Sequence, residues 1–242
     1  MFEALKRRGF QILTLHHAEA ILKHDMRTAV EELEAVLAEI SIPVAELVRG
    51  GGGEGELTQR LRRSLSETYG WKKHCFEIKT IVDGEEKECV SHEIDHVKRF
   101  PRGTFAMEIE WNNKDPFYDR DLENFKRLHA DGIISVGAII TRGTSLHEGM
   151  RDLIEAFATK EGIDSVGKLG DFYAPTARQI GIIESKAKSK GSFAKGWADA
   201  FVSDKFGEAT THWRKLEDRV RRGVGNPCPL LLIGIPKDAV QV

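Results

Sequence analysis

The chain has 242 residues, and its 36 Lys and Arg against 38 Asp and Glu give a net charge of -2. A content of 40% hydrophobic and 31% charged residues is typical of a globular protein, and the 12 Phe and 4 Trp argue against a disordered chain. The longest uninterrupted apolar run, Leu230 to Ile233, is far too short to span a bilayer. The composition therefore predicts a globular protein without a membrane segment.

The N-terminus and the cysteines predict the compartment. Charged residues interrupt Met1 to Arg8 where a secretory peptide needs an apolar core, so we expect a cytoplasmic protein. Cys75, Cys89 and Cys228 are odd in number and form no CxxC motif, which suggests neither a disulfide framework nor a zinc site. The near-neutral net charge does not exclude a nucleic-acid partner, but it restricts any basic surface to a local patch.

The first 70 residues read as helices. Apolar residues recur at steps of three and four from Ala18 to Ile40, which predicts one long amphipathic helix that ends at or before Pro43. Gly50 to Gly53 predict a flexible joint. A shorter helix, Leu57 to Tyr69, then ends at Gly70.

Three antiparallel strands are predicted next. Phe76 to Val82 alternate with polar neighbours and meet Asp83-Gly84, a strong hairpin turn signal, after which Glu88 to Val97 return as the partner strand. After the turn Phe100 to Gly103, a third strand is expected at Thr104 to Trp111.

After the third strand, helical and strand patterns of apolar residues alternate along the sequence. Asp119 is the expected cap of a helix that ends at Asp131-Gly132. The apolar run Ile133 to Ile140 suits a central strand, parallel to the preceding one and reached by a helical crossover. Ser145 and Glu148 suggest a capping box for the following helix.

The last third of the chain is less regular in sequence. Gly162 to Phe193 are rich in Gly and Lys and are expected to form an inserted loop or a small hairpin. A helix from Trp213 to Val220, a Gly-Pro turn and a strand from Leu230 to Ile235 are expected to close the chain. Together these elements predict an α/β fold with a mixed central sheet flanked by helices.

Acidic residues gather on the third predicted strand. Glu108 and Glu110 point to the same face of that strand, about 7 Å apart. If Pro101 and Arg102 are the two loop residues of the preceding turn, Asp95 lies directly opposite Glu108, with Cβ atoms about 5 Å apart. A three-residue loop would shift the register by one and turn Asp95 away. The sequence leaves both registers open.

Two interpretations of these acids are open. Like charges that face each other across a sheet are destabilising unless something positive lies between them, and a divalent cation with oxygen ligands meets that need. Metal-dependent phosphodiester hydrolysis uses such a cluster. The alternative is the ordinary charged face of a solvent-exposed strand. The polar residues Asn112, Asn113 and Lys114 at the strand end favour the first interpretation.

The acids resemble the motif of a known nuclease superfamily. Asp95 followed by Glu108-Ile109-Glu110 resembles the PD-(D/E)xK motif, and the predicted element order resembles the αβββαβ core of those nucleases, the restriction-endonuclease-like fold. Four blocks are similar to type II restriction endonucleases of the BglII, BstYI and BamHI group; they are Asp95 to Lys98, Ala106 to Glu110, Ile134 to Gly137 and Pro229 to Pro236.

The resemblance implies a type II restriction endonuclease that makes double-strand cuts in palindromic DNA by Mg²⁺-dependent hydrolysis, with a GATC-centred site as the first hypothesis. It implies one nuclease domain over residues 1–242, with N-terminal helices in 1–70, a catalytic core in 71–160, an inserted DNA-contacting region in 161–208 and a closing helix and strand in 209–242. A homodimer is implied, formed through the helices at 119–130 and 145–158, with a cognate DNA methyltransferase as functional partner. Alternatives are a repair or junction-cleaving nuclease of the same superfamily and an inactive DNA-binding relative.

The resemblance also assigns roles to residues. Asp95, Glu108 and the backbone carbonyl of Ile109 are the implied ligands of one or two Mg²⁺ ions. Glu110 takes the place of the usual motif Lys, as a Glu does in BamHI, and is either a general base or a metal ligand. Glu93 is the alternative to Asp95, and Glu56 or Glu67 is the candidate for a further acid from the N-terminal helices.

Two basic segments are candidates for DNA contact. Lys186, Lys188 and Lys190 could follow phosphates, and Arg221 and Arg222 precede a Gly-rich turn that could approach a groove. The competing interpretation is a solvated charged surface. The histidines at 16, 17, 92 and 96 lack HExxH spacing and are expected to be core or surface residues.

Overall fold

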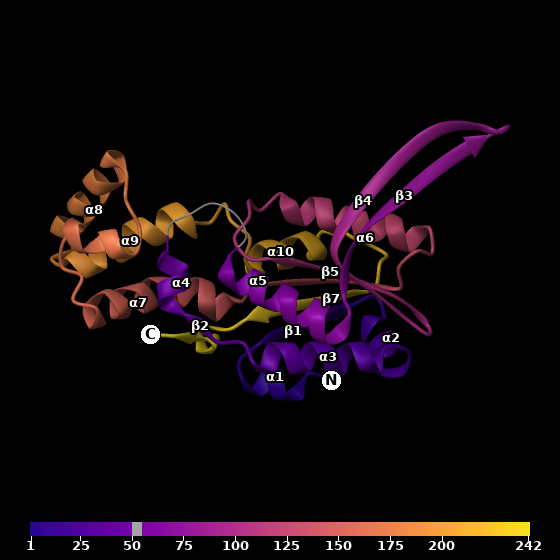
Figure 1. Cartoon of the computed structure of the whole chain (residues 1–242), viewed down its shortest axis with the longest axis horizontal. Coiled ribbons are helices and arrows are strands. Elements are labelled where there is room, and N and C mark those ends of the chain that lie inside the picture. The colour runs from indigo at the N-terminus through magenta and orange to yellow at the C-terminus, as the bar shows by residue number, and fades with distance from the viewer. Residues whose placement is uncertain (50–54) are drawn as a thin grey trace.

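A mixed six-stranded sheet lies at the centre of the computed structural model, which describes residues 1–49 and 55–242 (Figure 1). The strand order is β1-β7-β6-β5-β4-β3. The predicted joint at Gly50 to Gly53 lies outside the described residues. The strands of this sheet are β1 (Gln11–Leu15), β3 (Lys72–Val82), β4 (Glu85–Phe100), β5 (Gly103–Glu110), β6 (Val136–Arg142) and β7 (Leu230–Ile235). A small parallel pair is formed by β2 (Ile42–Pro43) and β8 (Val240–Gln241).

Helices cover both faces of the sheet (Figure 1). One face packs against α6 and α10, and the other face packs against the N-terminal helices together with α7. The helices are α1 (Glu3–Arg7), α2 (Ala18–His24), α3 (Arg27–Ala38), α4 (Val44–Val48), α5 (Glu56–Arg63), α6 (Phe117–Ala130), α7 (Thr144–Lys160), α8 (Ala177–Lys190), α9 (Phe193–Lys205) and α10 (Trp213–Arg221). A π-helical turn, Ser64–Thr68, extends α5, and 3-10 turns lie at Val166–Asp171 and Lys237–Ala239.

The sheet is antiparallel at its edges and parallel at its centre. Strands β3, β4 and β5 pair antiparallel, β5, β6 and β7 pair parallel, and β1 pairs antiparallel with β7. Every residue of β6 and β7 is buried, as expected for parallel strands covered on both faces. The order α5-β3-β4-β5-α6-β6 confirms the predicted αβββαβ core with its mixed sheet.

The two hairpin turns agree with the sequence. Asp83 and Gly84 connect β3 to β4 with positive φ angles of 53° and 84°, the conformation for which an Asp-Gly turn is suited. Phe100 pairs with Gly103 across a two-residue turn, and the same register continues to His96 opposite Met107. The register that brings Asp95 to Glu108 is therefore confirmed, and the three-residue loop is wrong.

The expected long helix at 18–40 is wrong, because the chain breaks between α2 and α3. Asp25 ends the first helix and pairs with Arg102 of the β4–β5 turn at 2.8 Å. Met26 turns into the core and is 1% exposed. Both halves keep their apolar side toward the sheet, so the periodicity alone did not reveal the break.

The expected irregular segment at 162–193 is also wrong, since most of it is helical. Thr176 and Gln179 form a capping box that starts α8, and Gly191 ends that helix in the left-handed conformation. Helix α8 packs against α9 and buries Ile183. Because α8 packs against the rest of the protein along one narrow surface, most of its residues are polar. The apolar periodicity that would predict a helix is therefore weak in this part of the sequence.

Three predicted starts of helices or strands differ from the structure. Helix α6 begins at Phe117, so Asp119 lies in its first turn and Pro116 occupies the cap position. Gly143 precedes α7, and the Ser145 hydroxyl accepts a hydrogen bond from the Lys237 amide instead of capping the helix.

The central strand is shifted as well. Strand β6 starts at Val136 and not at Ile133, because the Ile133 amide donates to the carbonyl of Leu128 at the end of α6. Gly132, with a φ of 69°, makes that helix end possible.

Candidate active site

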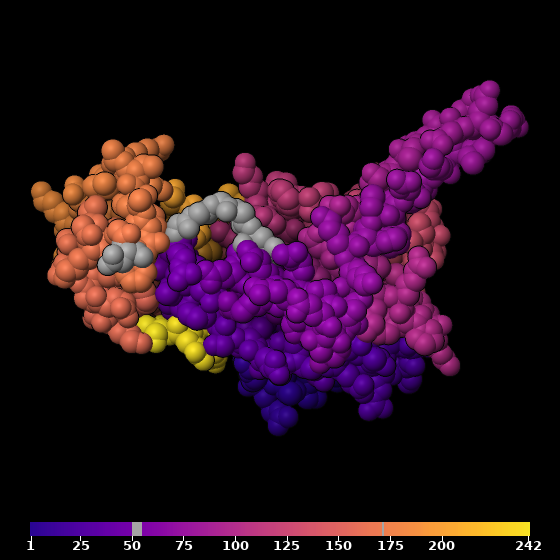
Figure 2. Space-filling view, viewed as in Figure 1, coloured from indigo at the N-terminus to yellow at the C-terminus, as the bar shows by residue number. Residues whose placement is uncertain are grey.

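Strand β4 leaves the sheet at Asp95. Its pairing with β5 stops at His96, while the pairing with β3 passes from Lys72 opposite Val97 to His74 opposite Ile94. Two residues of β4 therefore face one residue of β3, Lys73, and this mismatch is a β-bulge. Beyond the bulge, the β3–β4 ribbon stands away from the body of the molecule (Figure 2). The bulge places Asp95 at the point where the ribbon separates from β5.

Glu108 and Glu110 lie on the buried part of β5, facing α6. Their neighbours on β6 are Ile139 and Thr141, and the two glutamates are only 4% and 3% exposed. The backbone N–H of Asp95 lies 3.4 Å from Glu108 Oε1, and Asn113 Nδ2 donates to Glu110 Oε2 at 2.8 Å. The structure thus brings Asp95, Glu108 and Glu110 to one end of β5. A charged surface face, the alternative interpretation, does not describe the two buried glutamates.

A fourth acid, Asp121 of α6, joins this group and was missed in the sequence. It is fully buried, and its carboxyl interacts with that of Glu110. Arg120 Nη2 lies 2.8 Å from Asp121 Oδ1 and 3.7 Å from Glu110 Oε1. The signal was present, because Asp121 precedes Phe125 by four residues on the apolar face of the amphipathic helix, where an acid is unusual.

Burial and mutual repulsion change the ionisation of these acids. Burial, followed by the charges of Asp121, Asp95 and Glu110, raises the pKa of Glu108 to about 10. Burial, followed by the charge of Asp121, raises the pKa of Glu110 to about 8. Burial also raises the pKa of Asp121, against the opposing effect of Arg120. Perturbed carboxyl pKa values in such a group mark a functional site.

A groove of about 1080 Å³ opens beside these acids. Asp95 and Asn113, the hydrogen-bond partners of Glu108 and Glu110, both line it, whereas the two glutamates themselves do not. The charged residues of the lining come from the N-terminal helices, the ribbon and the end of α9; they are Glu46, Arg49, Glu56, Arg62, Lys72, Lys73, Asp95 and Lys205. More of these residues are basic than acidic, which suits a polyanionic ligand.

The acids suit a hard divalent cation. All offer carboxylate oxygens, the ligands that Mg²⁺ prefers, and Glu108 and Glu110 are held close together in a buried position where their negative charges are poorly compensated. A cation bound among them would restore their ionised form. The donor set and its burial therefore fit Mg²⁺.

The alternative acids lie in different positions. Glu93 is on the exposed part of the ribbon, paired with Lys73 at 2.7 Å, whereas Asp95 lies 3.6 Å from the same lysine. Glu56 lines the groove and pairs with Arg49 at 2.5 Å. Glu67 is exposed in the π-helical turn and is not part of the groove lining. Glu56 is therefore better placed than Glu67 to join the site.

The basic residues proposed for DNA contact lie outside the groove. Lys186 of α8 pairs with Asp199 at 3.0 Å, and Lys188 and Lys190 occupy exposed positions on the same helix. Arg221 and Arg222 each pair with an acid four residues earlier in the chain. The structure does not bring these five residues to the acids, and their contact with DNA stays a prediction.

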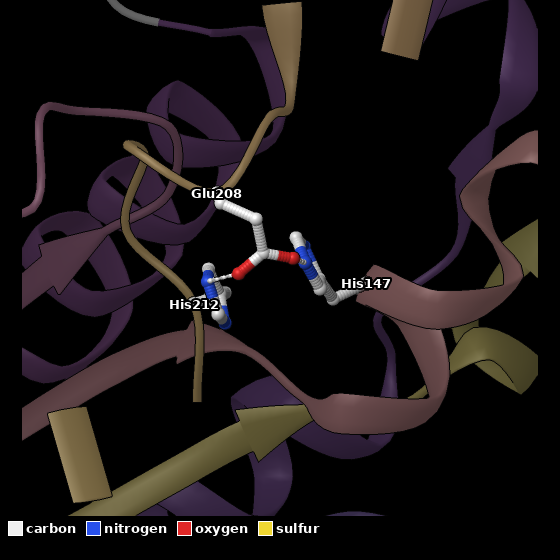
Figure 3. A group of neighbouring side chains, drawn as sticks. All are labelled: His147, Glu208 and His212. Atoms are coloured by element: carbon white, nitrogen blue, oxygen red, sulfur yellow. Dashed lines mark hydrogen bonds and ion pairs between the residues drawn. The ribbon is translucent and has the colours of Figure 1, made fainter. Parts of the chain in front are cut away.

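A second group of ionisable residues lies between α7 and the segment before α10 (Figure 3). The carboxylate of Glu208 reaches His147 Nε2 at 3.1 Å and His212 Nε2 at 3.6 Å. The two imidazoles are stacked, with 3.8 Å between centroids and 8° between planes. Ring nitrogen lone pairs lie in the ring plane, so parallel rings do not converge on one metal ion. The buried Arg142 and the nearby Arg214 add positive charge.

The stacked rings do not have the geometry of a metal site, and the contacts of Glu208 link α7 to the segment before α10. Burial lowers the pKa of His212 to about 4, so its ring is neutral at pH 7. The neighbouring Thr211 accepts a hydrogen bond from the Asn113 amide at 3.1 Å. The group thus fixes the segment that contacts Asn113, the partner of Glu110.

The fold and the acids together define a class of enzyme. A mixed sheet with the αβββαβ order and carboxylates at the end of its third core strand is the arrangement of nucleases with the restriction-endonuclease-like fold. The model of the restriction endonuclease BglII/BglIII family matches residues 10–235. The chain belongs to this family, which implies a hydrolase that acts on DNA. A search of curated proteins found no match. Among the described residues, no helix combines the length and apolar character needed to cross a membrane.

Proposed function

We propose that the protein is a type II restriction endonuclease that cuts both strands of a palindromic site by Mg²⁺-dependent phosphodiester hydrolysis. The observation that carries this proposal is the group formed by Asp95, Glu108 and Glu110 at the end of β5, where two carboxyls are buried together beside a groove. Membership of the BglII/BglIII family supports the DNA substrate. A GATC-centred palindrome is the first hypothesis for the recognition sequence.

In this proposal Asp95, Glu108 and the backbone carbonyl of Ile109 hold Mg²⁺. Mg²⁺ held by these residues would supply Lewis acidity towards the scissile phosphate and the attacking water. Asp95 lines the groove and contacts Glu108 through its backbone, so it connects the place where DNA would enter to the buried acid. The raised pKa of Glu108 supports this assignment, because a positive charge beside the carboxylate would favour its ionised form.

Glu110 is proposed to hold the attacking water and accept its proton. Burial and Asp121 raise its pKa to about 8, near the range in which a general base works best at neutral pH. Asn113 donates to one carboxyl oxygen at 2.8 Å and so fixes the orientation of the group. A Lys at this position could not take a proton in its charged form, so Glu110 differs in chemistry from the usual motif residue.

The assembly follows from the proposed substrate. Two identical chains read a palindrome most simply as a two-fold dimer, and we propose that α6 and α7 form the interface. Residues lining the groove, including Lys72 and Lys73, are proposed to contact DNA phosphates, with Lys186, Lys188, Lys190, Arg221 and Arg222 as further candidates. A cognate DNA methyltransferase as functional partner and a cytoplasmic location belong to the same proposal.

The test separates cleavage from binding. Glu108→Gln and Asp95→Asn should abolish cleavage in Mg²⁺ yet keep DNA binding in a gel-shift assay with Ca²⁺, which supports binding with little cutting in this proposal. EDTA should abolish cleavage by the wild-type protein, and Mg²⁺ or Mn²⁺ should restore it.

Glu93→Gln is the matched control, because Glu93 lies two residues from Asp95 on the same strand and contacts the same lysine. It should cleave at a rate close to that of the wild type. Loss of cleavage in Glu93→Gln with normal cleavage in Asp95→Asn would show that Glu93 is the ligand. Normal cleavage by Glu108→Gln would contradict the proposed site.

A further inference from the structure

Asp121 has one carboxyl oxygen that no protein donor satisfies. Arg120 binds its Oδ1 through Nε at 2.9 Å and Nη2 at 2.8 Å. Its Oδ2 is buried and has no hydrogen-bond donor among the described residues. The residue as a whole is fully buried. A buried carboxylate oxygen without a donor is strongly unfavourable, so this position calls for a positively charged or proton-donating partner.

The partner lies in the direction of Glu110. The same nitrogen, Arg120 Nη2, lies 2.8 Å from Asp121 Oδ1 and 3.7 Å from Glu110 Oε1, so the two carboxyls are neighbours, and each also shifts the other's pKa. Glu110 is 3% exposed and comes from β5, whereas Asp121 comes from the first half of α6. Two buried acids that meet from different elements need a proton or a cation between them, and a cation position would meet that need.

The charges of the site point the same way. Four carboxylates gather here when Asp121 is included with Asp95, Glu108 and Glu110. Arg120 compensates one of them, and Lys73 is shared between Asp95 and Glu93. One Mg²⁺ would leave negative charge in excess, and the scissile phosphate would add more. A second divalent cation, together with Arg120 and one phosphate, brings the four carboxylates to neutrality.

We propose that Asp121 forms a second divalent-cation position beside Glu110, next to the one assigned to Asp95 and Glu108. The proposal rests on the proposed function, because it adds a ligand to the same site. Asp121 would bind the ion through Oδ2 while Oδ1 stays with Arg120. The guanidinium of Arg120 is half exposed and lies 4.4 Å from the centre of the Phe117 ring, which keeps it beside the site.

The first test counts bound Mn²⁺ by electron paramagnetic resonance, using the metal alone and the intact protein. The wild type should bind two Mn²⁺ per chain and Asp121→Asn should bind one. Glu123→Gln is the control, since Glu123 is a solvent-accessible acid on the same helix, paired with Lys126 and Arg127, and it should still bind two. A count of one for the wild type, or equal counts and affinities in wild type and Asp121→Asn, would overturn the proposal.

The same titration separates this proposal from the proposed function. Asp95→Asn should lose the other ion and keep the one at Asp121. If Asp95→Asn and Glu108→Gln both bind Mn²⁺ as the wild type does, the ligand assignment under the proposed function fails, whatever Asp121→Asn shows.

The second test compares melting temperatures and excludes a purely structural role. Asn is almost the same shape as Asp but uncharged, so Asp121→Asn should raise the melting temperature in EDTA by removing a buried like charge. It should also reduce the rise in melting temperature that Mn²⁺ produces. If Asp121 serves only to hold Arg120, the substitution should lower the melting temperature in EDTA and leave the Mn²⁺ effect unchanged, which would contradict the proposal.

Discussion

Replacing Glu108 by Gln should make the metal-free protein more stable, and more so at high pH. Burial and three neighbouring acids raise the pKa of Glu108 from 4.5 to about 10. The folded state therefore holds a proton that the unfolded state has released over this pH interval. Because the folded state binds more protons, the free energy of unfolding falls as the pH rises from about 4.5 to about 10.

The size of the effect follows from the pKa difference. Each pKa unit corresponds to about 1.4 kcal/mol, so keeping Glu108 protonated at pH 8 destabilises the folded state by about 5 kcal/mol. At pH 5 the same cost is less than about 1 kcal/mol. Gln is neutral in both states and bears no such cost, while its side-chain oxygen can still face the Asp95 amide.

Urea unfolding in EDTA at pH 8 and pH 5 measures this directly. Glu108→Gln should raise the free energy of unfolding by several kcal/mol at pH 8 and by little at pH 5. The accessible Glu123, paired with Lys126 and Arg127, provides the control Glu123→Gln, which should change stability by less than about 0.5 kcal/mol. Equal effects of Glu108→Gln at both pH values, or a loss of stability at pH 8, would show that the folded metal-free protein does not raise the pKa of Glu108.

Three further predictions concern packing, a buried ion pair and assembly. A Cβ atom on Gly137 would lie 2.7 Å from the Phe125 ring, so Gly137→Ala should lower the free energy of unfolding by about 1–3 kcal/mol; an unchanged urea midpoint would show that α6 can move aside. Lys98 Nζ contacts Glu32 at 2.5 Å, and that carboxylate also accepts from Trp71 Nε1 at 2.8 Å. Lys98→Met should therefore cost about 1–3 kcal/mol in the same assay, and a neutral result would contradict it. Light scattering at micromolar concentration should give a dimer, with and without DNA, and a monomer in both cases would contradict the proposed assembly.

The parts of the fold that follow local rules were predictable. The Asp83-Gly84 turn and the two-residue turn at Pro101-Arg102 fix the register of three strands, and that register places Asp95 beside Glu108. The alternation along β5 also predicts that Glu108 and Glu110 share a face. These inferences depend only on neighbours in the chain, where turn chemistry and side-chain period decide the structure.

The parts that depend on distant contacts were not predictable in the same way. Strand β1 has five half-buried residues and exists because it pairs with β7, far along the chain. The break between α2 and α3 involves Asp25 and its partner Arg102 in another element. Asp121 joins the site only because α6 crosses the sheet next to β5. The position of Asp121 on an apolar helical face can be seen in the sequence, but its proximity to Glu110 cannot.

Sequencing the DNA ends produced from a mixed-sequence plasmid library in Mg²⁺ tests site-specific cleavage, with Glu108→Gln as the parallel sample. Wild-type ends should map to one short palindrome, cut at a fixed position on both strands, and Glu108→Gln should produce no such ends. Ends scattered without a common sequence, or the same palindromic ends from Glu108→Gln, would contradict the claim that the acids on β5 perform site-specific cleavage.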